Sequence, residues 1–323
     1  MAFIVYGCFT LAAEDMNTLT RRHVLASPAA LAAAAATPRR MTMHLSCGAI
    51  GVKANQREAL DYAARFGFES IDAYAGELGR MSAAELDEFR ARMREKNIQW
   101  AIAGLPVEFR KDEDQFAAGL KELPAFAATL EKAGVTRVTT WIMPCHPSLT
   151  FLENFRLHAR RLLECTRVLH THGCRLGLEY VGPKTLWTSQ RYAFVHTLRE
   201  MKELTMATGK PGAGIVLDSW HWYTAGDTVA DLKTFAASDV MSVDINDAPA
   251  GIAVDRQVDS VRELPCATGG IDLATFLRTL DELGCDAPVR CEPFNEALRR
   301  MPAETALAAT AAALKKAFAL LSS

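Results

Sequence analysis

The sequence has no excess of positive charge and no apolar run long enough to cross a bilayer. It contains 36 Lys and Arg residues and 38 Asp and Glu residues, so its formal net charge is −2. Proteins that bind nucleic acid carry a basic surface field, and a membrane-spanning helix needs roughly 18 to 20 predominantly apolar residues. We therefore expect neither a nucleic-acid partner nor a membrane partner.

Two common sequence motifs are also missing. The 8 cysteines contain no C-x-x-C pair and are too sparse for the disulfide scaffold of a small secreted protein, so we interpret them as buried packing residues. The segment SCGAIGVKANQ, which follows the first predicted strand, does not match the G-x-G-x-x-G loop of dinucleotide-binding folds. With 50% hydrophobic and 23% charged residues, the composition is that of an ordinary globular protein.

Residues 1–40 differ in composition from the rest of the chain. The segment TRRHVL at 20–25 precedes an Ala-rich stretch and resembles a twin-arginine export signal, although Val24 replaces the usual Phe. The alternative is a mis-called extension, with the true start at Met16 or Met41. An export signal predicts a periplasmic protein and a start near Met41 predicts a cytoplasmic one. In both cases this segment lies outside the fold.

Over residues 41–323, apolar β-rich runs alternate with amphipathic helices, and no low-complexity linker divides them. Glycines end four of the helices, at Gly67, Gly134, Gly173 and Gly284. Eight strands are predicted to begin near residues 43, 69, 98, 137, 175, 214, 240 and 288. This count and length predict one domain with an α/β fold, a parallel (β/α)8 TIM barrel. A doubly wound open sheet is the alternative, and it would normally carry the glycine-rich loop that is missing here.

Four acidic residues come at the ends of the last four predicted strands: Glu179, Asp218, Asp244 and Glu292. The carboxyl ends of barrel strands meet at one mouth, where the active sites of such barrels lie. Four converging carboxylates repel one another unless a cation lies between them. The pattern therefore predicts a metal site.

On these residues the chain from about 44 to 320 resembles the xylose-isomerase-like TIM barrel family of sugar isomerases and epimerases, which shares its fold with AP endonuclease family 2. The resemblance implies one divalent metal ion, bound by the four acids, with Asp218 and His221 forming a D-x-x-H element. Asp244 stands where many relatives carry a histidine ligand. Asp247 is the alternative candidate for this metal ligand, in which case Asp244 would lie outside the ligand set. An all-oxygen ligand set favours Mn²⁺ or Mg²⁺ over Zn²⁺.

The resemblance also implies a reaction. A metal-dependent isomerase or epimerase transfers a proton next to a carbonyl through an enediolate, with Glu179 and Glu292 as the catalytic acid and base. If the enediolate expels a neighbouring group instead, the same site is a lyase or dehydratase acting on a keto-sugar, an inosose or a 3-keto-glycoside. The sequence leaves both reactions open.

Several polar residues near the strand ends are candidates for binding a small carbohydrate substrate. These are His221, Lys184 after the fifth strand, His146 after the fourth, and Arg256 or Arg262 after the seventh. The long segment from Asp247 to Thr268 is expected to act as a lid or as a contact in a homo-oligomer. Aromatic residues near the strand ends, Trp141 and Phe294 among them, suit the apolar faces of a sugar.

Two other function classes fit the sequence less well. A DNA-repair nuclease related to endonuclease IV would need several histidines at strand ends, and only His146 and His221 of the 8 histidines follow strands. A non-catalytic binding protein with this barrel would gain nothing from the four buried acids, which lower its stability when no metal ion is bound. Both are less favoured than the metal-dependent enzyme.

The assignment of residues 1–40 to a segment outside the fold can be tested by truncation. A protein that starts at Met41 is expected to unfold at the same temperature as the full chain, because no core residue is lost. Circular dichroism melting curves of the two proteins provide the measurement. A large drop in the melting temperature would show that the segment is part of the fold.

Overall fold

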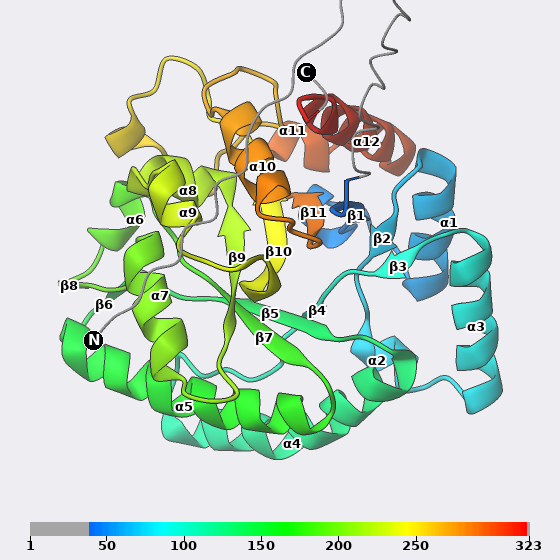
Figure 1. Ribbon diagram of the computed structural model, residues 1–323, viewed down its shortest axis with the longest axis horizontal. Coiled ribbons are helices and arrows are strands. Elements are labelled where there is room, and N and C mark those ends of the chain that lie inside the picture. Colours follow the sequence, from blue (N-terminus) through cyan, green and yellow to red (C-terminus); the bar gives the residue numbers. More distant parts are fainter. Residues whose placement is uncertain (1–38, 322–323) are drawn as a thin grey trace, which may run out of the picture. The chain divides into compact units, whose positions relative to one another are not determined.

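The computed structural model describes residues 39–321, and nine of their strands form one parallel sheet (Figure 1). The order of its strands is β3-β2-β1-β11-β10-β9-β7-β5-β4. Their bounds are β1 Thr42–Leu45, β2 Ser70–Ile71, β3 Gln99–Trp100, β4 Ala103–Gly104, β5 Arg137–Trp141, β7 Arg175–Glu179, β9 Gly214–Asp218, β10 Val240–Ile245 and β11 Pro288–Cys291.

The two ends of this sheet meet in one short segment. β3 pairs with β2 and β4 pairs with β5, while only Ala101 and Ile102 separate β3 from β4 along the chain. The segment therefore acts as one interrupted strand that closes the sheet into a barrel with eight strand positions. The predicted α/β barrel and each of its eight strands are confirmed.

Helices surround the sheet on its outer side (Figure 1). The longer ones are α1 Gln56–Phe66, α3 Ala83–Glu95, α4 Glu113–Ala133, α5 Phe151–Thr171, α7 Leu198–Ala207, α10 Leu273–Glu282 and α12 Ala303–Ala319. Shorter ones are α2 Ala75–Leu78, α6 Lys184–Trp187, α8 Ser219–Ala225, α9 Val229–Leu232 and α11 Glu296–Arg299. The four predicted cap glycines all have positive φ, between 69° and 80°. This conformation favours glycine and stops a helix before the next strand.

A small antiparallel pair that the sequence did not predict lies among the loops that follow β5 and β7. β6 (Cys145–His146) pairs with β8 (Tyr192–Ala193), and so joins these two loops. A second such link lies in the long segment after β10, where Asp247 and Glu263 form an isolated antiparallel bridge. These links hold the loops that surround the carboxyl ends of the strands.

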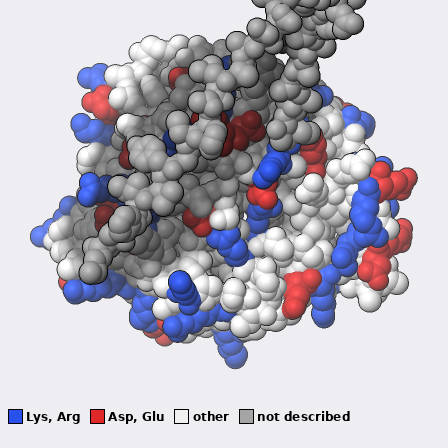
Figure 2. Space-filling view, viewed as in Figure 1, with Lys and Arg blue, Asp and Glu red and all other residues white. Residues whose placement is uncertain are grey.

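Acidic and basic side chains are interspersed on the visible surface of the described residues (Figure 2). The sequence of α3, AAELDEFRARMRE, carries its acids mostly in the first half and its arginines in the second. Within residues 39–321, no helix is long and apolar enough to cross a membrane. The export-signal hypothesis concerns residues that lie outside the described range. The fold itself includes Arg39, whose guanidinium pairs with Glu69 at 2.7 Å.

The interior of the barrel leaves no room for a side chain at Gly177 on β7. A Cβ atom there would lie 2.6 Å from Cβ of Met241, closer than real Cβ atoms approach. We expect Gly177→Ala to lower the free energy of unfolding by about 1 to 3 kcal/mol, the usual cost of overpacking. Gly104→Ala on β4 is the matched control, since its Cβ would meet nothing within 4 Å. Equal urea midpoints for the two variants would contradict this packing.

Candidate metal site

Four carboxylates converge at the carboxyl ends of four strands that are neighbours in the sheet. Glu179 ends β7, Asp218 ends β9, Asp244 is the next-to-last residue of β10, and Glu292 directly follows β11. Each offers one oxygen, and these oxygens all lie within 4.8 Å of one another. Such a cluster of buried acids is unfavourable unless positive charge compensates it.

Two guanidinium groups provide part of this compensation. Nη1 of Arg262 donates to Oδ2 of Asp218 at 2.7 Å and lies 3.6 Å from Oε2 of Glu292. Arg290 binds both oxygens of Asp244, at 2.8 and 2.7 Å, and donates to Oε1 of Glu292 at 3.1 Å. Charge-assisted pairs of this kind are among the stronger hydrogen bonds in proteins.

The compensation is incomplete at Glu179. Its Oε1 is buried and has no hydrogen-bond partner. Burial, together with the nearby Glu292, Asp244 and Asp218 carboxylates, raises the pKa of Glu179 well above its usual value. Two guanidiniums do not balance four carboxylates, and Arg262 is also shared with Asp259 at 2.8 Å, so negative charge remains that a divalent ion would neutralise. The donor set and the unpartnered oxygen therefore fit a divalent metal ion.

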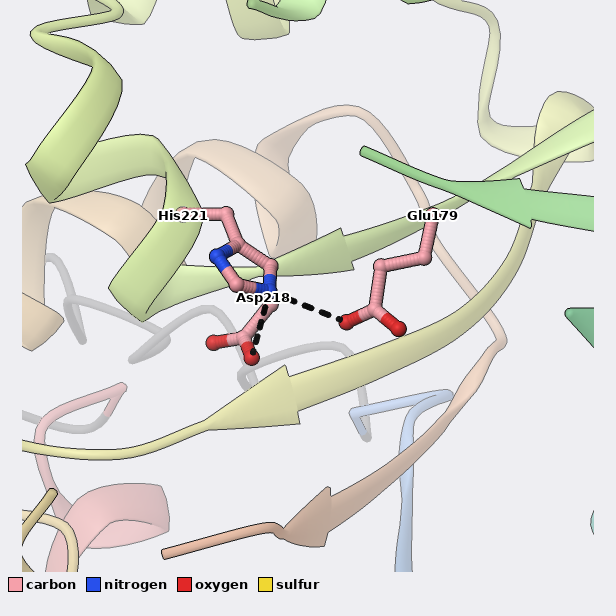
Figure 3. A group of neighbouring side chains, drawn as sticks. All are labelled: Glu179, Asp218 and His221. Atoms are coloured by element: carbon pink, nitrogen blue, oxygen red, sulfur yellow. Dashed lines mark ion pairs between the residues drawn. The ribbon is translucent and has the colours of Figure 1, made fainter. Parts of the chain in front are cut away.

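The D-x-x-H element places His221 beside two of these carboxylates (Figure 3). Asp218 caps α8, because its side chain accepts from the backbone N–H of Trp220, and His221 lies on the first turn of that helix. Its Nε2 is 3.7 Å from Glu179 and 3.8 Å from Asp218, so Glu179, Asp218 and His221 form a second group that could bind an ion.

His221 is neutral in this environment. Burial and the adjacent Arg262 guanidinium lower the pKa of His221 to about 3. Its Nδ1 accepts a hydrogen bond from the backbone N–H of Gly182 at 3.2 Å. A neutral imidazole that accepts at Nδ1 carries its proton at Nε2. The shorter of its two contacts therefore favours a proton at Nε2, facing Glu179 and Asp218, although Nη2 of Arg262, which can only donate, lies 3.4 Å from that nitrogen.

Asp247, the rival of Asp244, has a different role. Its two oxygens accept from four backbone N–H groups, those of Ala248, Thr268, Gly269 and Ile271. These bonds join the beginning and the end of the long segment after β10. Asp247 belongs to neither group of described residues that could hold an ion.

A cavity of about 430 Å³ opens beside the carboxylate cluster. Its polar wall consists of Glu179, His221, Asp259, Arg262 and Glu292. Its apolar wall consists of Trp141, Met143, Val181, Leu186 and Phe294. The cavity thus combines acids that could move protons with a surface suited to the C–H face of a small ring.

Of the residues predicted to bind substrate, His221 and Arg262 line this cavity, whereas Lys184, His146 and Arg256 are absent from its lining. Lys184 lies 3.9 Å from Asp255 on an exposed surface, and Arg256 is exposed. Nδ1 of His146 accepts from the backbone N–H of Leu149 at 2.8 Å, which ties it to its own loop. The role of these three in substrate binding remains a prediction.

Sequence reasoning missed Asp259 on the cavity wall and two residues around the carboxylates. Arg290 lies two positions before Glu292, so strand alternation places both side chains on one face of β11, and this signal was available. Asn246 connects three strand ends. Its Nδ2 donates to Oδ1 of Asp218 at 3.2 Å, and its Oδ1 accepts from the backbone N–H of Glu292 at 2.9 Å. An asparagine after a strand gives no comparable signal in the sequence.

The protonation of Asp218 predicts how stability depends on pH when no metal is bound. Burial raises the pKa of Asp218 to about 7 from its ordinary 3.8; the Arg262 guanidinium opposes this shift, and the Asp244 and Glu292 carboxylates add to it. Between these values the folded protein holds a proton that the unfolded chain has released. Asp218 therefore stabilises the fold at low pH, and this contribution is lost as the pH rises through 7.

We expect the free energy of unfolding of the chelator-treated protein to fall by about 1 kcal/mol more between pH 6 and pH 8 in the wild type than in Asp218→Asn. Urea unfolding at the two pH values measures this difference. Asp259→Asn is the control, because the adjacent Arg262 guanidinium lowers the pKa of Asp259 despite its burial. An equal pH dependence in the wild type and Asp218→Asn would refute the assignment.

Three comparisons with known proteins bear on this site. Inosose isomerase of Bacillus velezensis is 24% identical over 276 residues, which cover 82% of this chain and 94% of that protein. A xylose isomerase domain protein from Alicyclobacillus acidocaldarius has a solved structure with a TM-score of 0.72 and 29% identity, covering 87% of this chain and 98% of that one. The structure of IOLI with a bound zinc atom gives a TM-score of 0.71 at 21% identity, covering 87% of this chain and 98% of that one.

The family described as xylose isomerase-like TIM barrel matches residues 60–317, which is most of the chain and contains all four carboxylates. The closed barrel and the strand-end site agree with this match. The chain therefore belongs to the xylose isomerase-like TIM barrel family.

Proposed function

We propose that the protein is a divalent-metal-dependent isomerase or epimerase that acts on a small carbohydrate next to a carbonyl group. The observation that carries the proposal is the buried, unpartnered oxygen of Glu179 within a four-carboxylate cluster at the wall of a cavity. Relatives of the chain are enzymes. The inosose isomerases among them support the proposal, as do epimerases of the same fold, while a 3-dehydroshikimate dehydratase supports the lyase alternative. The zinc atom of the IOLI structure supports a metal in this fold.

The carboxylates of the chain supply the proton transfer. Glu179 and Glu292 both line the cavity, one from the end of β7 and the other after β11. One removes the proton from the carbon next to the substrate carbonyl, and the other returns a proton to the enediolate. A bound divalent ion would polarise the carbonyl and stabilise the negative charge of the enediolate. The all-oxygen cluster favours Mn²⁺ or Mg²⁺ for this role.

Neighbouring groups would hold the substrate in place. Nε2 of neutral His221 donates a hydrogen bond to a substrate oxygen. Arg262 is held by Asp218 and Asp259 at 2.7 and 2.8 Å, so its guanidinium is fixed before substrate arrives. The apolar wall, which includes Trp141 and Phe294, packs against the C–H face of the sugar and excludes water.

A lyase or dehydratase reaction is the second candidate. It would begin with the same proton removal by Glu179 or Glu292, and would differ only when the enediolate expels a substituent on the next carbon. Product analysis by NMR separates the two reactions. An isomerase or epimerase returns a product of the same mass, whereas a lyase releases water or an aglycone.

The assignment of the two glutamates predicts the loss of proton exchange. With Mn²⁺ and keto-sugars or inososes screened in D₂O, the wild type is expected to incorporate deuterium next to the carbonyl of its substrate. Glu179→Gln and Glu292→Gln should each slow this incorporation by about 10² to 10⁴-fold, the usual contribution of a general acid or base. Proton NMR measures the exchange.

Glu296→Gln is the matched control, since Glu296 lies four residues beyond Glu292 with a side chain that is 73% exposed. It should retain the wild-type exchange rate. Circular dichroism checks that all three variants are folded. Exchange that survives in both Glu179→Gln and Glu292→Gln would refute the assigned roles.

A further inference from the structure

Asp244 differs from the other three carboxylates because one buried guanidinium, that of Arg290, binds both of its oxygens. Nε and Nη2 of Arg290 donate to Oδ1 and Oδ2 at 2.8 and 2.7 Å. The two residues are register partners on the neighbouring strands β10 and β11. The Asp244 side chain is fully buried and that of Arg290 is 15% exposed. The pair therefore has the two-pronged geometry of a strong, desolvated ion pair.

The hydrogen bonds of the Arg290 side chain go only to acids of the cluster. Besides Asp244, Nη2 binds Oε1 of Glu292 at 3.1 Å. Asp72, which follows β2 and accepts a hydrogen bond from Nε2 of His44 at 2.8 Å, adds a further negative charge near the guanidinium. Arg290 is thus fixed between the third and fourth carboxylates, and orients Glu292.

None of the remaining carboxylates has both oxygens bound by one guanidinium. In Asp218 only Oδ2 is bound by a cation, Arg262, while Oδ1 accepts from the neutral N–H groups of Trp220 and Asn246. Oε1 of Glu179 has no hydrogen-bond partner. Oε2 of Glu292 lies 3.6 Å from Arg262, beyond hydrogen-bond distance. For Asp244 to serve as an ordinary ligand, an oxygen would have to be shared with or released from Arg290. A buried guanidinium that loses its partner is strongly unfavourable.

We propose that Asp244 is the counter-ion of Arg290 rather than a ligand of the metal, and that Arg290 is a positioning residue for Glu292. The ion would then be held by Glu179, Asp218 and Glu292. The inference rests on the proposed metal-dependent function and assigns the parts of its site. It alters the ligand set expected from the sequence, in which Asp244 was the third ligand.

Removing the pair as a unit tests this inference. In Asp244→Leu/Arg290→Met both charges disappear together, and position 244 retains no oxygen. Replacing both members of a buried ion pair by apolar residues is often tolerated, whereas removing one is not. Isothermal titration with Mn²⁺ should give a dissociation constant within about threefold of the wild type. Glu179→Gln, which removes a proposed ligand, should weaken binding by about 30-fold or more.

The single variant Arg290→Gln provides an independent readout. It leaves a buried, unneutralised Asp244 carboxylate near the ion, so Mn²⁺ should bind at least about tenfold more tightly than to the wild type. The melting temperature of this variant should also rise more on adding Mn²⁺ than that of the wild type. If the Asp244→Leu/Arg290→Met protein does not fold, Asp244→Asn/Arg290→Gln replaces it. Its affinity for Mn²⁺ is likewise expected to stay near that of the wild type.

The outcomes separate this inference from the proposed function. If the double variant loses Mn²⁺ affinity as severely as Glu179→Gln does while Arg290→Gln does not, Asp244 is a ligand and the inference is overturned, while the metal-dependent function stands. If Arg290→Gln binds Mn²⁺ no more tightly than the wild type, the role of Arg290 in setting the charge of the site is overturned. If the wild type binds none of Mn²⁺, Mg²⁺ and Zn²⁺, both proposals fall.

Discussion

The balance of charge at the mouth of the barrel is the constraint on which the site depends. Four neighbouring parallel strands each end in a carboxylate, and their oxygens lie within 4.8 Å of one another. Two buried guanidiniums, from Arg262 and Arg290, neutralise part of this charge, and one carboxylate oxygen of Glu179 remains without a partner. A protein that keeps so costly an arrangement in its interior gains a binding site for a cation.

The long segment after β10 supplies part of this balance through Arg262. Asp247 binds four backbone N–H groups and so joins the two ends of the segment. The bridge between Asp247 and Glu263 holds the chain next to Arg262. The guanidinium of Arg262 can then reach Asp218, although it comes from a loop rather than from a strand. The segment is therefore part of the electrostatics of the site as well as one of its walls.

Much of the fold could be predicted from the sequence, because strand and helix periods and cap glycines are local signals. The position of the four acids at strand ends was also local information, and Arg290 follows from the alternation of β11. The path of a long loop depends on distant backbone groups. For that reason the burial of Arg262 and the structural role of Asp247 were not evident, and neither was the absence of Lys184 from the cavity lining.

The central claim is that the carboxylate cluster holds one divalent ion. Crystals grown with Mn²⁺ and measured near the manganese absorption edge test it most directly. We expect one anomalous peak between Glu179, Asp218 and Glu292, within about 2.0 to 2.6 Å of Oε1 of Glu179. A well-diffracting crystal with no peak there, or with the ion bound elsewhere, would show that the carboxylate cluster is not the metal site.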